Sequence, residues 1–392
     1  MLPKHFVLVT LLQILYGVSS VKPDAPDFDQ SRLKHSIDKT VAPAMHHFDI
    51  PGMAIALTVD GHEYFFNSGF TSRDNRQPIS NKTLFEIGSL SKTFAATLAT
   101  YAQQKGSLSL TDSVSSHLPA LRGSSFDQIT LLNLGTHTSG LPLSVPDNVQ
   151  DEEQLMRYLW HWKSPHRIGS HRIYSNIGIG LLGKIAAQSV HESYDDAIAK
   201  DLFRPIGMNH SYLRVPSVEQ QDYAQGYSTN NRPTRLNEGV LASEAYGVRT
   251  CTSDLIRFIE ANMQEIRLDA ALERAINATH TGYFKSGELT QDMVWEQYHY
   301  PVSLKRLLSG IAMTSVDATA RKLNPPLQPQ SEVLINKTGT TNGFAAYAAY
   351  LPARRIGIVI LANRSYPADA RVTAAYQILL EIEKLRAFKV GK

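Results

Sequence analysis

Residues 85–94 read Phe-Glu-Ile-Gly-Ser-Leu-Ser-Lys-Thr-Phe and place Ser89 three positions before Lys92. Apolar residues at intervals of four continue from Leu90, which predicts a helix with Ser89 near its first turn. Positions i and i+3 share one face of a helix, so the lysine amine can reach the serine hydroxyl. A serine hydroxyl becomes a good nucleophile only when a neighbouring group takes its proton. The segment therefore indicates nucleophilic serine chemistry.

Spacing alone does not single out this pair. A lone Ser-x-x-Lys is usually a pair on the protein surface, and we assign the first three copies in this chain to the surface. The fourth copy needs support from elsewhere in the sequence. The four copies are Ser19/Lys22, Ser31/Lys34, Ser36/Lys39 and Ser89/Lys92.

Two later motifs supply that support, and each occurs once. Tyr-Ser-Asn at 174–176 lies in a predicted loop that leads into a helix, and Lys-Thr-Gly-Thr at 337–340 ends a predicted strand. Each motif is common by chance, whereas the ordered combination with Ser89 and Lys92 is not. In this order the three motifs form the signature of serine enzymes that recognise penicillins.

The flanking segments extend the resemblance. Over nearly its whole mature length the sequence resembles class C β-lactamases, the cephalosporinases. Class A enzymes fit less well, because they carry Ser-Asp-Asn at the position of 174–176, and Pro233 or Ala320 stands where their Glu-x-x-Leu-Asn loop has its glutamate. The blocks that match class C enzymes are 85–94, 129–134, 138–142, 174–176, 245–248, 337–340 and Tyr366-Pro367 followed by Arg371.

The predicted fold class is α/β (α+β). We expect an antiparallel sheet flanked by helices and built from both chain termini, plus an inserted, mostly helical lobe, as in the β-lactamase/transpeptidase fold that the resemblance implies. Three apolar runs near the C-terminus predict consecutive antiparallel strands. The expected helices are 32–48, 154–162 and 371–385, and the expected strands are 52–59, a second one through Tyr64 and Phe66 after an Asp60-Gly61 turn, 333–336, 343–350 and 356–361.

A chain of 392 residues is long enough for two lobes. The predicted boundaries assign 21–106 and 201–392 to the α/β lobe and 107–200 to the helical lobe, with the active site between them. The segment 262–327 shows no clear pattern and is left unassigned.

The resemblance implies a role for each motif residue. Ser89 attacks the lactam carbonyl, and the backbone N–H groups of Ser89 and Thr340 form an oxyanion hole. Lys92 or Tyr174 takes the serine proton, and the sequence leaves open which of them is the formal base. Lys337 completes the catalytic set as a cation that favours phenolate. The residues implied to bind substrate are Asn176, whose amide also reaches Lys92, with Thr338, Gly339, Thr340, Tyr246 and Arg371.

Three expected binding positions depart from the family pattern. Ser144 stands where many class C enzymes carry glutamine, and Ser365 and Ala368 stand where they often carry asparagine. Each lost polar contact is typically worth about 0.5–1.5 kcal/mol. These departures are expected to change substrate preference without removing catalysis.

The composition excludes several other classes of protein. A net charge of +3 and the lack of a basic run with interleaved aromatics argue against a nucleic-acid partner. Cys251 is the single cysteine and is interpreted as a small buried hydrophobe. His-x-His-x-Asp does not occur, which disfavours a zinc lactamase, and His137 is interpreted as a satisfied structural residue. The resemblance implies no metal, no cofactor, and a monomer whose partner is a small-molecule β-lactam.

Residues 1–20 predict a secretory signal peptide. Lys4 and His5 precede an apolar run that is too short to span a bilayer, and small residues up to Ser20 mark the expected cleavage site. The mature protein is expected in the periplasm, without membrane contact after cleavage.

The leading hypothesis is an exported serine β-lactamase (EC 3.5.2.6) that favours cephalosporins and forms an acyl-enzyme on Ser89. A related DD-peptidase or esterase of the same fold is the alternative within the enzyme class. A penicillin-binding sensor is a third hypothesis, which requires a membrane segment or a partner domain.

Overall fold

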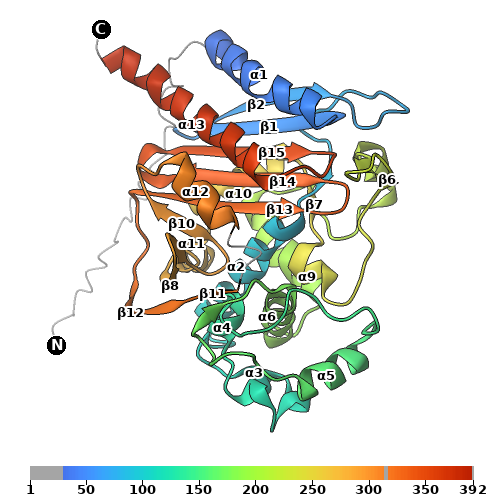
Figure 1. Cartoon of the computed structure of the whole chain (residues 1–392), viewed down its shortest axis with the longest axis vertical. Helices are drawn as coiled ribbons and strands as arrows, with labels where there is room; N and C mark the ends of the chain where they lie inside the picture. Colours follow the sequence, from blue (N-terminus) through green and yellow to red (C-terminus); the bar gives the residue numbers. More distant parts are fainter. Residues whose placement is uncertain (1–29, 313–316, 391–392) are drawn as a thin grey trace, which may run out of the picture.

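A computed structural model describes residues 30–312 and 317–390 (Figure 1). Its centre is one nine-stranded sheet in the order β12-β8-β9-β10-β13-β14-β15-β1-β2, and every pairing in it is antiparallel. The predicted sheet built from both ends of the chain is confirmed. Its strands are β1 (Gly52–Val59), β2 (His62–Gly69), β8 (Gly282–Ser286), β9 (Leu289–Gln291), β10 (Glu296–His299), β12 (Arg321–Leu327), β13 (Val333–Thr340), β14 (Ala345–Leu351) and β15 (Ile356–Ala362).

Helices surround this sheet, and a group of them extends below it in Figure 1. The 3₁₀ turn η1 (Gly88–Ser91) leads directly into the second helix. The helices are α1 (Gln30–His47), α2 (Lys92–Gln104), α3 (Val114–His117), α4 (Leu131–Gly135), α5 (Glu152–His161), α6 (Asn176–Ser189), α7 (Tyr194–Ile198), α8 (Arg204–Ile206), α9 (Ala242–Tyr246), α10 (Thr252–Asn262), α11 (Ala270–Ala278), α12 (Leu304–Ala312) and α13 (Ala368–Val390).

The centre of the sheet is buried on both faces. Successive side chains of a strand point to opposite faces. In β1, Ala54 and Ala56 therefore join one hydrophobic cluster, while Ile55 and Leu57 join another. Helices α1, α12 and α13 pack around the second cluster, and α10 packs against β1 and β15 on the other side. This double burial explains why β1 reads as a continuous apolar run.

Most predicted elements are present close to their expected bounds. The helix expected at 32–48 is α1, and the hairpin expected at Asp60-Gly61 joins β1 to β2 with Val59 opposite His62. Asp60 and Gly61 have φ of 52° and 78°, as a two-residue hairpin turn requires. The three C-terminal strands are β13, β14 and β15 in the expected antiparallel order.

The unassigned segment 262–327 supplies four strands of the sheet. Three of them, β8, β9 and β10, are short and contain buried polar side chains such as Ser286, Gln291 and Glu296, and β12 is mostly exposed, so none shows a clear apolar pattern. Arg172 satisfies two of them, since its guanidinium donates to Gln291 Oε1 and to Glu296 Oε1 at 2.7 Å each. The polar partner lies more than a hundred residues away in the sequence, where a local pattern cannot indicate it.

The boundaries of the two lobes at 107 and 200 stay a prediction. Within the described residues, no helix combines the length and the apolarity needed to cross a bilayer. The predicted signal peptide, residues 1–20, lies outside the described residues.

Strand β13 and the η1 turn approach each other through two glycines. A Cβ on Gly339 would lie 1.9 Å from Ile87 O, and a Cβ on Gly88, whose φ is 51°, would lie 2.5 Å from Thr340 N. Real side chains do not fit such gaps, so only glycine lets the two backbones lie in direct contact.

We expect Gly339→Ala to lower the free energy of unfolding by about 1–3 kcal/mol, because the added methyl group overpacks a contact between two backbones. Urea denaturation measures the loss. Gly239→Ala is the matched control, because its nearest neighbour is Tyr246 Oη at 3.9 Å. An equal loss of stability in both variants would contradict the close-approach argument.

Candidate active site

Ser89 lies in η1, and Lys92 is the first residue of α2. Lys92 is fully buried, and its ammonium donates to Ser89 Oγ at 2.9 Å and to the carbonyl oxygen of Ala245 at 2.7 Å. The second bond holds the amine against the turn before α2. The arrangement predicted for this Ser-x-x-Lys pair is present.

The other Ser-x-x-Lys copies that the structure describes lie on α1. Lys34 and Lys39 are exposed there, and Lys34 pairs with Asp38 at 2.6 Å. The surface assignment is confirmed for these two copies. The copy at Ser19/Lys22 lies outside the described residues.

Tyr174 lies between β4 (His171–Arg172) and α6, where Ser175 caps the helix through Gly178 N. The ammonium groups of Lys92 and Lys337 lie 5.3 and 5.0 Å from the centre of its ring. Its phenol oxygen is buried and has no hydrogen-bond partner of ordinary geometry among the described residues. Ser89 and Lys337 nevertheless lie close enough to this oxygen to favour phenolate by hydrogen bonding.

Burial and charge act in opposite directions on this phenol. Burial favours the neutral phenol, but the charges of Lys337 and Lys92 outweigh it and lower the pKa of Tyr174 to about 8. Burial also favours the neutral form of Lys92, and for an amine this lowers the pKa, here to about 8. Two adjacent groups with similar pKa values exchange a proton at little cost, and they titrate as a pair.

Strand β13 presents a free edge to Ser89. Its partner β10 pairs only with Val333–Asn336, so residues 337–340 have β14 on one side and η1 on the other. The Lys337 ammonium donates to the carbonyl oxygen of Thr338 at 3.0 Å. An unpaired strand edge offers backbone donors and acceptors to a ligand that lies along it.

Arg371 reaches this edge through Thr340. The arginine is buried, and its guanidinium donates to Thr340 Oγ1 at 2.6 Å and to the carbonyl oxygen of Tyr366 at 3.2 Å. Because the threonine oxygen accepts from the arginine, its own proton is free to be donated outward. The resemblance implies that Arg371 binds substrate, and the structure shows its buried guanidinium bound to the Thr340 hydroxyl.

A hollow of about 550 Å³ adjoins Thr340. Ser365 lines it, together with Arg232 from the loop between β5 (Gly226–Tyr227) and β6 (Pro233–Thr234). Ala368 is not among its lining residues, because it begins α13 and packs against the hydrophobic cluster under that helix.

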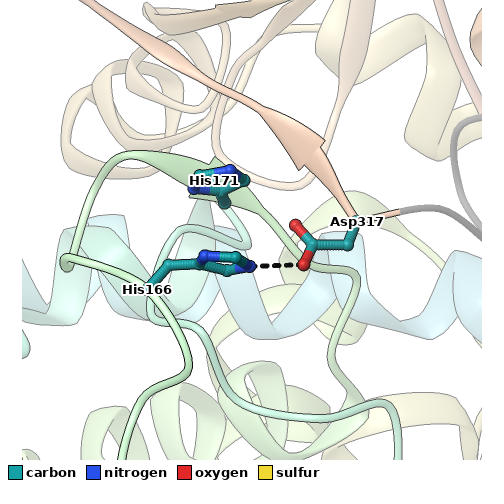
Figure 2. Close-up of side chains that lie close together, drawn as sticks. All are labelled: His166, His171 and Asp317. Atoms are coloured by element: carbon teal, nitrogen blue, oxygen red, sulfur yellow. Dashed lines mark hydrogen bonds and ion pairs between the residues drawn. The ribbon is translucent and has the colours of Figure 1, made fainter.

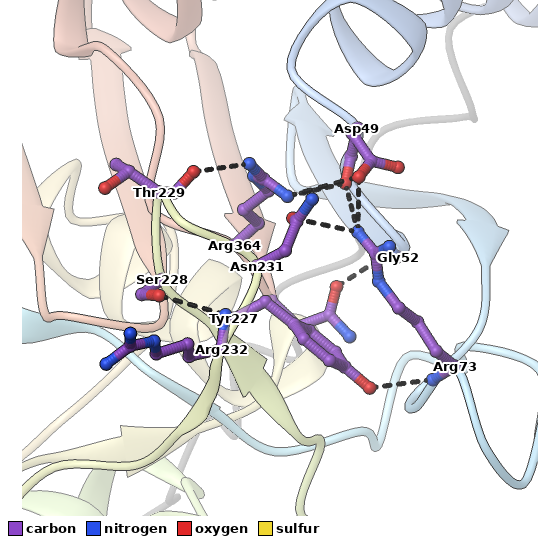
Figure 3. Close-up of polar contacts among 10 residues, drawn as sticks. Asp49, Gly52, Arg73, Tyr227, Ser228, Thr229, Asn231, Arg232 and Arg364 are labelled. Carbon is purple, nitrogen blue, oxygen red and sulfur yellow. Dashed lines mark hydrogen bonds and ion pairs between the residues drawn. The ribbon is translucent and has the colours of Figure 1, made fainter.

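The wall of this hollow is anchored to the ends of β1 and β15 (Figure 3). Tyr227 Oη accepts from Arg73 N at 2.8 Å, and Arg364 donates to the carbonyl oxygen of Thr229 at 2.9 Å. Asp49 pairs with both arginines, at 2.8 Å with Arg73 and 3.3 Å with Arg364. The loop is therefore fixed by several polar contacts.

Asn176, Ser144 and Tyr246 meet on the other side of the site. All three line a small cavity of about 30 Å³, and Asn176 Nδ2 lies 3.4 Å from Ser144 Oγ. The expected contact between Asn176 and Lys92 is not formed within the described part of the chain, because the lysine ammonium is bound to Ser89 and to Ala245 O.

Comparisons with known proteins agree with this geometry. The family described as Beta-lactamase matches residues 37–382 of the chain. The chain belongs to the beta-lactamase family. A beta-lactamase of Providencia stuartii is 42% identical over 353 residues, which cover 90% of this chain and 92% of the relative.

Solved structures show which class of the beta-lactamase family this chain resembles. One of them is the crystal structure of a class C beta-lactamase in complex with cefoxitin, whose sequence is 53% identical to this chain. The match covers 90% of this chain and 99% of that protein, with a TM-score of 0.89. A beta-lactamase/D-alanine carboxypeptidase from Pseudomonas syringae is 46% identical, covers 89% of this chain and 99% of its own, and has a TM-score of 0.87. The resemblance to class C enzymes is confirmed.

His137 holds Tyr174 in this member of the beta-lactamase family. Its ring packs on the tyrosine ring with centroids 4.3 Å apart, and its Nδ1 accepts from Ser175 N at 3.2 Å. Burial lowers the pKa of His137 well below its usual value, and the positive charges of Arg172, Lys92 and Lys337 lower it further. The imidazole is therefore neutral.

The interpretation of His137 as a satisfied residue is wrong for one of its nitrogens. Because Nδ1 accepts, the proton of the neutral ring is on Nε2, which is buried and has no partner among residues 30–312 and 317–390. The sequence offered one signal, the short Thr-His-Thr-Ser-Gly run at 136–140, which overlaps the matching block 138–142. The contact with Tyr174 depends on a turn that a local pattern does not indicate.

We expect His137→Phe to lower the free energy of unfolding by about 1–3 kcal/mol, because the buried Ser175 N–H loses its acceptor. His137→Asn should retain most of the stability, since Asn Oδ1 occupies the place of Nδ1 and asparagine tolerates the φ of 58° found here. Urea denaturation compares the two variants. Equal stability of both would contradict the role assigned to Nδ1.

Proposed function

We propose that this chain is an exported class C serine β-lactamase. It hydrolyses the β-lactam amide, with cephalosporins favoured, through a covalent acyl-enzyme on Ser89. The observation that carries the proposal is the hydroxyl of Ser89 at 2.9 Å from a buried lysine, beside a tyrosine whose pKa two lysines lower to about 8. Export is supported by the composition of residues 1–20.

In acylation, Ser89 Oγ forms a bond with the lactam carbonyl carbon while its proton passes to the Lys92–Tyr174 pair. The tetrahedral intermediate collapses as the C–N bond breaks, and Tyr174 returns the proton to the leaving nitrogen. In deacylation, water attacks the ester carbonyl, loses a proton to Tyr174, and Ser89 recovers that proton as it leaves. Every proton taken up is returned, so the pair is regenerated after each turnover.

The negative charge on the carbonyl oxygen needs donors that are fixed before the reaction. The backbone N–H groups of Ser89 and Thr340 are the proposed donors, because the contact of η1 with β13 brings these two segments together. Removing one donor of this kind typically costs about 10²–10³ in rate.

The substrate carboxylate is assigned to the end of β13. Thr340 Oγ1 accepts from buried Arg371, so its proton can be donated to a carboxylate oxygen, and Lys337 and Thr338 add charge and a second hydroxyl. The acyl side chain is assigned to Asn176 and Tyr246 across the site.

The three departures from the class C pattern act at the margins of this site. Ser144 lies within reach of Asn176, and Ser365 lines the hollow beside Thr340, so both can bear on substrate preference. Ala368 adds no polar group to that hollow and is assigned no contact of its own.

D-alanine carboxypeptidase activity is a second candidate. The relative from Pseudomonas syringae carries both names at 46% identity, and the carboxylate site at Thr340 suits the C-terminus of a D-Ala-D-Ala peptide as well as a lactam. Acylation at Ser89 is common to both reactions.

A turnover panel of penicillins, cephalosporins and a D-Ala-D-Ala peptide tests the proposal. We expect steady hydrolysis of a chromogenic cephalosporin, abolished in Ser89→Ala and unchanged in Ser36→Ala, which alters the matching surface copy on α1. Retained turnover in Ser89→Ala would remove Ser89 from its role. Stalled acylation by the cephalosporin together with peptide cleavage would favour the carboxypeptidase.

Thr340→Val should raise the KM for a cephalosporin about 10-fold or more, because the hydrogen bond to a charged carboxylate is lost and Arg371 loses its acceptor. Thr340→Ser retains the hydroxyl and should stay close to the parent. The ester of the same cephalosporin separates the causes, since it lacks the carboxylate charge. An equal effect of Thr340→Val on acid and ester would refute the assigned contact.

A further inference from the structure

Two histidines and an aspartate meet beside β4, where it pairs with β11 (Ala318–Thr319) (Figure 2). The rings of His166 and His171 are stacked with centroids 3.7 Å apart, and His166 Nε2 lies 2.5 Å from Asp317 Oδ2. One ligand-type atom from each residue lies within 4.8 Å of the others. Imidazole nitrogens and a carboxylate oxygen are the ligands that zinc prefers when no thiolate is present.

The backbone brings these three residues together, and one imidazole must turn from the stacked arrangement before both rings can direct a nitrogen lone pair at the same ion. Thr319 pairs with His171 and Ala318 with Arg172, and Ala320 N donates to the carbonyl oxygen of Ser170 at 2.8 Å. His171 therefore lies on a paired strand and Asp317 directly precedes one, while His166 lies in the loop before β4.

Hydrogen bonding fixes which nitrogen of His171 is free. The hydroxyl of Ser170 donates its only proton to the carbonyl oxygen of Arg167 at 2.7 Å. It lies 2.9 Å from His171 Nδ1 and must accept there, so Nδ1 carries the proton of the neutral ring. The lone pair is then on Nε2. Metal-binding histidines have this arrangement, in which one ring nitrogen donates to a neighbouring oxygen and the other binds the metal.

We propose that His166, His171 and Asp317 bind a divalent transition metal, with Zn²⁺ as the probe. Three protein ligands leave a fourth tetrahedral position for water. Two imidazoles among three ligands favour zinc over calcium or magnesium, which take oxygen ligands. Binding at His166 Nε2 replaces the hydrogen bond to Asp317, and the neutral ring then carries its one proton on Nδ1.

The metal would link the loop before Tyr174 to the strand after residue 316. Its ligands are outside the proposed catalytic set, so the inference does not depend on the proposed function. The expected consequence is stability: at a free Zn²⁺ concentration 100 times the Kd, a chain of this size should gain about 3 °C in Tm.

The test uses the mature chain without an affinity tag, treated with a chelator and dialysed. Calorimetric titration with Zn²⁺ should give one ion per chain, and Co²⁺ should give the visible absorption of a tetrahedral nitrogen and oxygen site. His171→Ala and His166→Ala should each weaken binding at least 10-fold, in line with the loss of one of three ligands.

His117→Ala is the matched control, because His117 pairs with the carboxylate of Asp112 at 2.9 Å and is not in the three-residue group. It should bind metal like the parent. The absence of stoichiometric binding, binding that survives both ligand substitutions, or the spectrum of hydrated Co²⁺ would each overturn the proposal. Turnover of a cephalosporin by the metal-free protein is measured in parallel, so failure at this site is distinguishable from failure of the enzyme assignment.

Discussion

The contact of two backbones at Gly88 and Gly339 is the constraint on which the rest of the site depends. It places the turn that carries Ser89 directly against the free edge of β13. The two sides of this contact belong to different parts of the chain but share one hydrophobic cluster, which contains Ile87 and Leu90 as well as Val333 and Ile335 of β13. The strand edge can serve a ligand because the pairing of β13 with β10 stops at Asn336, four residues before β13 ends.

The electrostatic properties of the site follow from the burial of several cationic side chains with few acidic side chains beside them. Lys92 and Lys337 are buried beside the Tyr174 ring, and Arg172 is neutralised by Glu296 at 2.7 Å behind it. Burial lowers the pKa of Lys92, and the neighbouring cations lower the pKa of the Tyr174 phenol. His137 can pack against this cluster only as a neutral ring, which is the state that its hydrogen bond to Ser175 requires.

How much of this could be predicted from the sequence differs from element to element. The apolar run of β1 and the turn at Asp60 have local causes, and both were predicted. The short strands after residue 280 have polar residues whose partner is Arg172, and such a cause is not local. At the site, the order of motifs predicted Ser89, Lys92, Tyr174 and Lys337, and their side chains lie close together in the structure. It could not show that Arg371 acts through Thr340, because that depends on how α13 packs.

The order of the strands also has a consequence for how the chain folds. Strand β1 pairs with β2 on one side and with β15 on the other, so the N-terminal hairpin waits for a partner that is synthesised nearly 300 residues later. Until then β1 has an open edge and uncovered apolar faces, which are sites for aggregation. A chain shortened before β15 would keep that edge exposed. The sheet can therefore be completed only when almost the whole polypeptide is present, and deletions near the C-terminus should affect solubility before they affect chemistry.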